Sequence, residues 1–417
     1  MSDYQAFDLI VIGGGPAGFF GALSAAESYP NLRIVILEKG NKLLRKVRIS
    51  GGGRCNVTHA CFDPAELVGY YPRGGPELRG PFSRFQPGDT IEFFESRGVK
   101  LKTEADGRIF PVSDDSADIV NCLLDEVRRN GIQIRTGANV TTISHVDAGY
   151  EVTLLDGTQL ATRKLLIAAG GGSDPTYRLI RTLGHTIIPP VPSLFTFEIN
   201  DPRLEGLAGV SVPQVSLTIP DAASRRSPTI ESSGPLLVTH WGISGPAVLK
   251  LSAWGARALA DTGYHLPLTV NWLPAEMQDS AFKLLRQNKI SSPRQQIGSH
   301  PIGDLPTRLW QHLVTAAGIP LYQPWTELSD KALQSLAKEL TAGEYQISGK
   351  GVFKEEFVTC GGVSLKEVDF RTMESKISPG LHFAGEILDI DGVTGGFNFQ
   401  ACWTTGYLAG RGIAEKN

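Results

Sequence analysis

Apolar and polar positions follow their most regular pattern near the N-terminus of the chain. The apolar run 7–12 leads into a glycine-rich stretch at 13–18, a segment of helical periodicity follows, and a second apolar run ends at Glu38. Short uninterrupted apolar runs are typical of strands that are buried on both faces of a parallel sheet. The pattern therefore predicts a strand, a helix and a second parallel strand, which together form a βαβ unit.

Small residues occupy the turn of this unit. Gly13 allows a tight turn, Gly15 lets the main chain approach a pyrophosphate, and Gly18 lets the helix pack closely against the strand. The N-terminus of the helix offers unpaired amides and partial positive charge to phosphates. Glu38, 20 positions after Gly18, is placed to accept hydrogen bonds from a ribose diol. We expect a dinucleotide site here, whose further members are Pro16, Ala17 and Lys39.

A basic, glycine-rich loop follows the second strand. Its three successive glycines remove side chains from one side of the path, as is needed where the backbone passes closely over a ligand. The cations around it are Arg45, Lys46, Arg48 and Arg54, for which we favour contact with the phosphates of the protein's own cofactor. The candidate cofactor residues of the loop are Ser50, Gly51, Gly52, Gly53, Arg54, Cys55 and Asn56.

Helices and short strands are predicted between residues 90 and 171. We expect helices at 90–97 and 113–130, a hairpin at 99–112, and short strands at 140–145, 150–155 and 159–161, followed by the apolar run 164–169. Simple NAD domains connect their parallel strands with helices, whereas a β-meander before a strand that ends in small residues is typical of FAD-binding domains. Ala169, Gly170 and Gly171 are therefore candidate cofactor contacts. Val140 is a candidate for contact with the adenine or, equally, an ordinary buried valine.

The composition changes near residue 190. Short β-like runs at 196–199, 214–219, 236–239 and 266–272 lie among prolines and polar turns, and helical patterns such as 307–317 and 330–340 follow. We interpret this region as an insertion. The predicted domains are an FAD-binding domain at 1–190 and 355–417, a β-rich insertion domain at 191–274 and 342–354, and a small helical domain at 275–341.

The C-terminal segment returns to the first domain. An apolar strand at 380–386 ends in Gly385 and Glu386, a second glycine-rich turn occupies 392–400, and a helix is expected at 400–410. A strand followed by glycine and an acid holds the ribityl chain in flavoproteins with two dinucleotide folds, so we assign Glu386 to the ribityl hydroxyls. The dipole of the following helix would stabilise an anionic reduced flavin. The turn residues expected to line the flavin are Gly395, Gly396, Phe397 and Asn398.

Bulk composition narrows the class of protein. The 417 residues, of which 41% are hydrophobic and 20% charged, fit a soluble globular chain with two or three domains. No run of eighteen apolar residues and no leader segment is visible, so we expect a cytoplasmic protein without a membrane span. The five cysteines lack metal-ligand spacing, so reduced thiols and no metal are expected. The net charge of −3 does not suggest non-specific binding of nucleic acid.

Longer motifs resemble a known family. The stretches KVRISGGGRCNVT at 46–58, THWGISGP at 239–246, GGV at 361–363 and GGFNFQ at 395–400, with Glu386 and Asp389, resemble the motifs of the BaiN/RdsA-type NAD(P)/FAD-dependent oxidoreductases, also catalogued as the aminoacetone oxidase family. The similarity extends over essentially the whole chain. It implies an α/β, Rossmann-like FAD domain with two dinucleotide-binding elements and a β-meander crossover, interrupted by a β-barrel-like domain that carries a small helical domain.

The resemblance also implies non-covalent FAD and several possible substrates. Members of this family are said to reduce conjugated double bonds of steroid-like molecules, to oxidise aminoacetone, or to reduce a uridine of large-subunit ribosomal RNA to dihydrouridine. We expect NAD(P)H to deliver hydride to the flavin and the flavin to reduce a conjugated C=C bond, with ribosomal RNA uridine the leading substrate. An amine oxidase, a small-molecule enone reductase and a non-catalytic flavin-bound module are the alternatives.

The proton donor and the electron donor site have weaker signals. His240 and Cys360 are the candidate acids, since histidine has a suitable pKa near ~6.5 and a thiol can also donate a proton. Their alternatives are a turn histidine that satisfies the backbone and a small buried strand residue. No second Gly-x-Gly-x-x-Gly unit follows a strand, so NAD(P)H would visit the flavin transiently through the cleft that the substrate uses. Ping-pong kinetics should follow.

Overall fold

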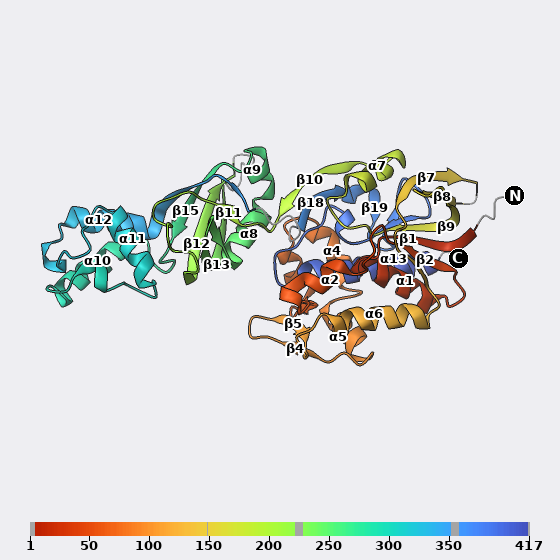
Figure 1. The fold of residues 1–417 in the computed structure, drawn as a ribbon, viewed down its shortest axis with the longest axis horizontal. Coiled ribbons are helices and arrows are strands. Elements are labelled where there is room, and N and C mark those ends of the chain that lie inside the picture. Colours follow the sequence, from red (N-terminus) through yellow and green to blue (C-terminus); the bar gives the residue numbers. More distant parts are fainter. Residues whose placement is uncertain (1–4, 148, 222–227, 352–357, 416–417) are drawn as a thin grey trace. The chain divides into compact units, whose positions relative to one another are not determined.

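The computed structural model describes residues 5–147, 149–221, 228–351 and 358–415 (Figure 1). The chain divides into two compact units. The first consists of the N-terminal part up to Val191 and the C-terminal part from Val358, and the second begins at Pro192 and fills the interval between them. The C-terminal segment thus returns to the body that the N-terminal strands begin.

A parallel sheet forms the centre of the first unit. Its strands lie in the order β21 (Leu381–Phe383), β9 (Gln159–Ile167), β1 (Gln5–Ile12), β2 (Ile34–Leu37) and β6 (Gln133–Arg135). The side chains of the central strands are buried on both faces, which is why the runs 9–12 and 34–37 contain only apolar residues. The predicted βαβ unit is confirmed, with helix α1 (Pro16–Ser28) between β1 and β2.

The meander is formed by β7 (Val140–Val146), β8 (Gly149–Leu154) and the first half of β9. We predicted a short strand at 159–161 and a separate run at 164–169, and this division was wrong. A single strand β9 pairs antiparallel with β8 and parallel with β1 along its length. The polar Thr162 does not interrupt it, because its hydroxyl donates to the carbonyl of Lys164 at 2.7 Å.

Helices α1 and α13 (Phe397–Glu415) lie side by side, as Figure 1 shows. Two glycines of α13 make this close approach possible: a Cβ at Gly406 would lie 2.6 Å from the carbonyl oxygen of Ala17, and one at Gly410 2.4 Å from that of Gly21. Four residues further along α13, the contact lies four residues further along α1, so the two helices run in the same direction. Their N-termini therefore face the same side of the sheet.

Shorter elements complete the first unit, and they include the predicted hairpin. The helices are α2 (Arg45–Ile49), α3 (Pro64–Leu67), α4 (Gly75–Phe82), α5 (Pro87–Glu95), α6 (Ala117–Arg129) and α7 (Asp174–Thr182). The strands are β3 (Thr58–His59), β4 (Leu101–Thr103), β5 (Arg108–Pro111), β10 (Ile187–Ser193, at the boundary between the units), β18 (Val358–Val363), β19 (Val368–Asp369) and β20 (Glu374–Ser375).

The second unit contains an antiparallel sheet and helices. In spatial order the strands are β16 (Gly343–Ile347), β15 (Leu266–Asn271), β12 (Ser211–Pro220), β13 (Thr229–Thr239), β14 (Gly242–Ser244), β11 (Phe197–Glu198) and β17 (Gly349–Lys350). The two edge strands, β16 and β17, are separated in the chain only by Ser348. The chain therefore passes from one edge strand of the sheet to the other through a single residue.

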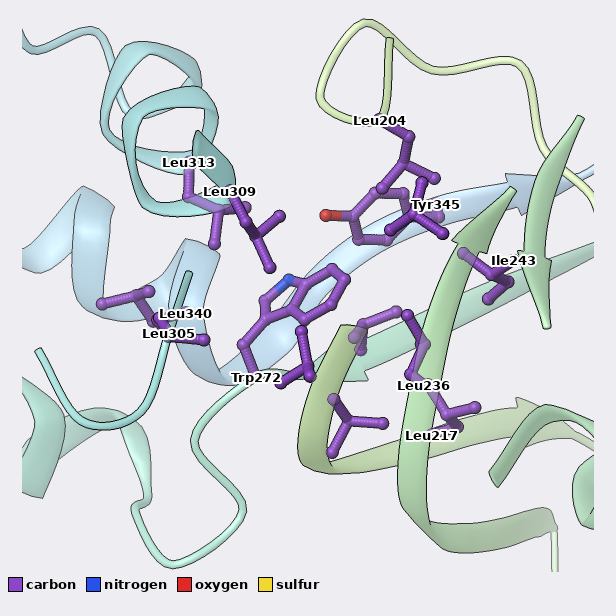
Figure 2. Packing of buried hydrophobic residues seen from close by; sticks show 14 of the residues in the cluster. Leu204, Leu217, Leu236, Ile243, Trp272, Leu305, Leu309, Leu313, Leu340 and Tyr345 are labelled. Carbon is purple, nitrogen blue, oxygen red and sulfur yellow. The ribbon is translucent and has the colours of Figure 1, made fainter. Parts of the chain in front are cut away.

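The helices of the second unit pack on this sheet through a shared core. They are α8 (Pro246–Trp254), α9 (Ala256–Asp261), α10 (Gln278–Ser291), α11 (Thr307–Ala316) and α12 (Asp330–Ala342). Trp272, at the end of β15, is 2% exposed and lies between Leu309 and Leu340 of the helices and Leu217 and Leu236 of the strands (Figure 2). One continuous cluster of buried side chains thus joins the strands to the helices.

Candidate FAD site

The turn between β1 and α1 is tightly packed at Gly18 and open to solvent at Gly15. Gly13 has a φ of +118°, and a Cβ at Gly18 would lie only 2.0 Å from the carbonyl oxygen of Gly13, so the turn is closed on this side. A Cβ at Gly15 would meet no atom within 4 Å. Gly15 is also the N-cap of α1 and supplies no side-chain cap, with Pro16 and Ala17 behind it. The turn therefore presents an open, uncapped helix N-terminus, which suits a pyrophosphate.

Glu38 is held rigidly at the end of β2. One carboxylate oxygen accepts from the amide of Gly14 at 2.8 Å and the other accepts from the amide of Gly40 at 2.7 Å. Each oxygen keeps a further lone pair. The carboxylate is thus positioned beside the helix N-terminus to accept a ribose hydroxyl, while Lys39 lies next to it in the chain.

Four of the five residues from 51 to 55 in the glycine-rich loop have a left-handed backbone conformation. Gly51, Gly52, Gly53 and Cys55 have positive φ values of 58°, 70°, 87° and 60°. Added Cβ atoms at Gly52 and Gly53 would meet no neighbour within 4 Å, so this stretch offers bare backbone. Cys55 lies underneath it, and burial raises the pKa of its thiol to about 12. This thiol therefore stays protonated and packs the loop.

Arg54, a predicted cofactor residue, contacts the neighbouring hairpin in this structure. Its guanidinium pairs with Glu104 at 2.7 Å and lies 4.0 Å from the ring centroid of Phe110. Both contacts belong to the hairpin β4–β5. They hold the loop that contains Ser50 against the hairpin, so Arg54 fixes the position of the loop.

Asn56 connects the loop to the C-terminal turn. With its amide oriented to satisfy both groups, its oxygen accepts from the amide of Gly396 at 3.0 Å, and its nitrogen donates to the carbonyl of Thr58 at 3.0 Å. A Cβ at Gly396 would lie 2.6 Å from the backbone of Thr58, so only glycine fits this crossing. Two segments predicted to hold one cofactor are thereby joined directly.

An aromatic stack supports the C-terminal turn. The ring of Phe397 contacts those of Tyr70 and His59, with centroid separations of 4.2 and 4.7 Å, and the Tyr70 and His59 centroids lie 5.8 Å apart. The amide of Asn398 exchanges hydrogen bonds with both backbone groups of Gly392 at 2.8 and 2.9 Å. Asn398 therefore closes the turn, and Gly395, with φ +128°, completes it.

Glu386 is held by two partners that the sequence did not assign to it. One oxygen lies 2.5 Å from Nζ of Lys46, and the other accepts from the amide of Thr359 at 2.8 Å. A Cβ at Gly171 would lie 3.0 Å from Cγ of Glu386, and one at Gly385 would lie 2.7 Å from Cβ of Ala17. The ends of β9, β18 and β21 thus converge with α1 and α2 around this carboxylate.

The offset between the two helices agrees with the length of a flavin cofactor. Gly406 lies against the first turn of α1, and α13 begins nine residues earlier, at Phe397. At 1.5 Å per residue this places the N-terminus of α13 ~13 Å beyond that of α1. A pyrophosphate at α1 and a flavin ring near α13, with Glu386 at the ribityl chain between them, fit this spacing. The described residues are therefore suited to hold FAD.

Other predicted residues have the following positions. Ala169 and Gly170 follow β9, and Gly170, with φ +76°, has open space beside it. Val140 begins β7 and is partly buried. Cys360 lies fully buried in β18. His240 is exposed in the turn between β13 and β14 of the second unit, where it lines a cavity of about 480 Å³ together with Thr239 and Asn200.

Sequence reasoning missed the partners of Glu386. Lys46 was noticed only as part of a basic cluster, and the amide of Thr359 carries no signal in its residue type. Within the described ranges, no three histidine, cysteine or acidic side chains are arranged to hold a metal ion. No helix in the same ranges is long and apolar enough to span a membrane.

Comparison with known proteins agrees with this geometry. Residues 7–412 match the family model described as "HI0933-like protein Rossmann domain". The chain is 31% identical over 413 residues to the 3-dehydro-bile acid delta(4,6)-reductase of Clostridium scindens, covering 97% of this chain and 98% of the relative. It is 31% identical over 428 residues to the ribosomal RNA dihydrouridine synthase of Escherichia coli, covering 99% and 100%.

A solved structure shows the same fold. The 3-ketosteroid-delta4-(5alpha)-dehydrogenase of Rhodococcus jostii RHA1 superposes with a TM-score of 0.51 at 13% identity, covering 100% of this chain and 98% of the other. The family match spans nearly all residues. The chain therefore belongs to the HI0933-like Rossmann family and is an FAD-dependent oxidoreductase.

Proposed function

We propose that this flavoprotein takes electrons from NAD(P)H and reduces a C=C bond conjugated to a carbonyl, with a uridine of ribosomal RNA as the leading substrate, in the cytoplasm. The observation that carries the proposal is the pair of full-length relatives at equal identity. One is named as a reductase of a bile acid with double bonds, and the other as a synthase of dihydrouridine. Both names describe hydrogen addition to a conjugated double bond, which makes this the shared chemistry.

FAD, when bound, supplies hydride transfer and lets a two-electron donor and a C=C acceptor react in separate half-reactions. The chain's own residues bind and orient it. The open N-terminus of α1 at Gly15 would hold the pyrophosphate, Glu38 the ribose, and Glu386, held by Lys46, the ribityl hydroxyls. The N-terminus of α13 would supply partial positive charge to the flavin.

We propose that His240 or Cys360 delivers the proton. The two side chains differ in their exposure to solvent. The His240 ring is exposed beside a cavity, so a substrate can reach it. The Cys360 side chain is 0% exposed, so a substrate can reach it only after β18 moves. We therefore place His240 first. A positioned acid contributes about 10²–10⁴-fold, so His240→Ala should lower turnover within that range while flavin reduction by NAD(P)H persists.

The decisive experiment deletes the gene in its source organism and maps dihydrouridine in ribosomal RNA, with and without complementation. Loss of a single dihydrouridine that returns with the intact gene supports the RNA substrate. An unchanged map contradicts it and directs attention to small unsaturated molecules. Anaerobic consumption of NAD(P)H by the purified holoprotein supports a reductase, whereas peroxide release with aminoacetone identifies an amine oxidase. Bound FAD that NAD(P)H cannot reduce would indicate a binding module.

A further inference from the structure

One segment in the helical part of the second unit carries only positive charge. Between Asp279 and Asp304 the sequence has four cations and no acidic residue, in a chain whose net charge is −3. Lys283 and Arg286 lie on the exposed side of α10, and Arg294 follows the helix. Arg286 lies 3.6 Å from Asp330, with both side chains 56% exposed, and 5.9 Å from the ring centroid of Phe282.

A two-stranded ribbon continues this exposed side. Residues 295–298 bond to 321–325, with amide–carbonyl distances of 2.9 Å for Gly298 to Leu321 and 3.0 Å for Trp325 to Gln295. Gln296 and Pro324 form a single β-bridge between the two segments. Ile297 and Trp325 are buried, whereas Gln296 and Tyr322 are exposed.

The buried side of the ribbon is anchored. The indole nitrogen of Trp310 donates to the carbonyl of Ile297 at 2.6 Å, and the rings of Trp310 and Trp325 stack with centroids 6.4 Å apart. Two large side chains of this part are exposed: Tyr322, in the second segment, is 73% exposed, and Ile290, near the end of α10, is 79% exposed. Exposed aromatic rings and cations are the groups that bind a flexible charged strand with flat bases.

We propose that Lys283, Arg286, Ile290, Arg294 and Tyr322, here called the basic ribbon surface, bind the RNA strand that carries the substrate uridine. This inference rests on the proposed function. The cations contact phosphates, and the Tyr322 ring stacks on an unpaired base, while the neighbouring amides of Gln295 and Gln296 are available for hydrogen bonds. The absence of acidic residues from 280–303 favours a polyanion as the partner over a protein of mixed charge.

The test measures binding of the FAD-loaded full chain to a fluorescein-labelled RNA hairpin with a uridine-rich loop, by fluorescence anisotropy at several salt concentrations. The triple variant Lys283→Gln, Arg286→Gln, Arg294→Gln should bind about tenfold or more weakly, with a salt slope reduced by about 2. Tyr322→Ala should also lose about tenfold in affinity but keep the salt slope. Bound FAD per chain and circular dichroism report that the variants are folded.

A matched control removes three exposed arginines of the first unit, Arg163, Arg178 and Arg181, by substitution with glutamine. This control should bind RNA as the wild type does. An equal loss in both triple variants, or wild-type affinity in the ribbon variants, overturns the proposed surface. RNA binding that depends on the surface, together with a dihydrouridine map that the gene deletion leaves unchanged, would contradict the proposed substrate reaction and leave the surface standing. If a variant of the basic ribbon surface formed dihydrouridine at the wild-type rate, the proposed surface would be contradicted and the proposed substrate reaction would stand.

Discussion

Gly15 and Gly18, three positions apart at the start of α1, have different roles. Gly18 is required for packing, because a side chain there would collide with the carbonyl of Gly13 at 2.0 Å. Gly15 has open space and an ordinary φ of −93°, so alanine fits its backbone. The sequence motif presents both as equal members of a fingerprint. The structure separates a folding role from a ligand role.

This separation predicts the behaviour of two variants. Gly15→Ala should fold normally without FAD but bind FAD about tenfold or more weakly, because its methyl group fills space meant for the pyrophosphate. Gly18→Ala should lower the stability of the apoprotein by about 1–3 kcal/mol through overpacking. Urea unfolding of the apoprotein and quenching of FAD fluorescence measure the two effects. Equal losses of apoprotein stability in both variants would contradict the assignment.

The ion pair of Lys46 and Glu386 offers a second test at the residue scale. If Lys46 orients the carboxylate that holds the ribityl chain, then Lys46→Gln and Glu386→Gln should each weaken FAD binding about tenfold. In a double-mutant cycle their effects should couple by about 0.5–3 kcal/mol, since the two side chains touch. Lys42→Gln, at an exposed position of the same loop, is the control. Additive effects in the cycle would show that the pair does not act as a unit.

At the scale of elements, a buried polar cluster joins the segment before β10 to β20. His185 is 4% exposed, and its ring nitrogens lie 3.0 Å from a carboxylate oxygen of Glu367 and 2.9 Å from Oγ of Ser375. The hydroxyl of Ser375 also accepts from the amide of Ser378 at 2.7 Å. The arrangement suits a neutral ring that donates to Glu367 and accepts from Ser375. Burial lowers the pKa of His185 despite the opposing effect of Glu367.

This lowered pKa predicts acid sensitivity. The unfolded chain binds a proton at His185 near pH ~6.5, whereas the folded chain resists protonation until a lower pH, so the stabilising contribution is complete above ~6.5 and is lost as the pH falls toward the folded value. The pKa of Glu367 is lowered too, which adds a loss of the same sign at more acidic pH. Urea unfolding at several pH values measures the slope. His185→Gln should flatten it below pH ~6.5, and an unchanged slope would refute the role of this cluster.

At the scale of the whole molecule, the cofactor residues are distributed unevenly. The glycine turn, the glycine-rich loop, Glu38 and Glu386 belong to the first unit, which the chain completes only after returning at Val358. The second unit has its own core around Trp272 (Figure 2). FAD should therefore stabilise one of two cooperative bodies.

Calorimetry of the intact chain tests this division. The apoprotein should show two transitions, and FAD at a hundredfold excess over its dissociation constant should stabilise the first unit by about 2.7 kcal/mol while leaving the other transition in place. Trp272→Ala, which removes a large side chain from the core of the second unit, should lower only the second transition. A single transition that shifts as a whole in both experiments would show that the units unfold together.

Local sequence patterns already determine the main elements of the first unit and the family of this protein. The strand–turn–helix order at 7–38, the bare glycines at 51–53 and the strand with Gly385 and Glu386 each have local causes in burial or backbone freedom. They suffice to predict the parallel sheet, the FAD site and the chain segments that compose it. The long motifs also suffice for the family, because local chemistry and spacing survive in the linear order of residues.

The tertiary structure decided which partners these residues have. Arg54 pairs with the hairpin, Lys46 and the amide of Thr359 hold Glu386, and the close approach of α1 and α13 depends on glycines far apart in the chain. Strand β9 also continues through a polar stretch because β1 pairs with it on both sides of that stretch. Such choices depend on which segments meet in space, and a residue's type and its neighbours in the chain do not contain that information.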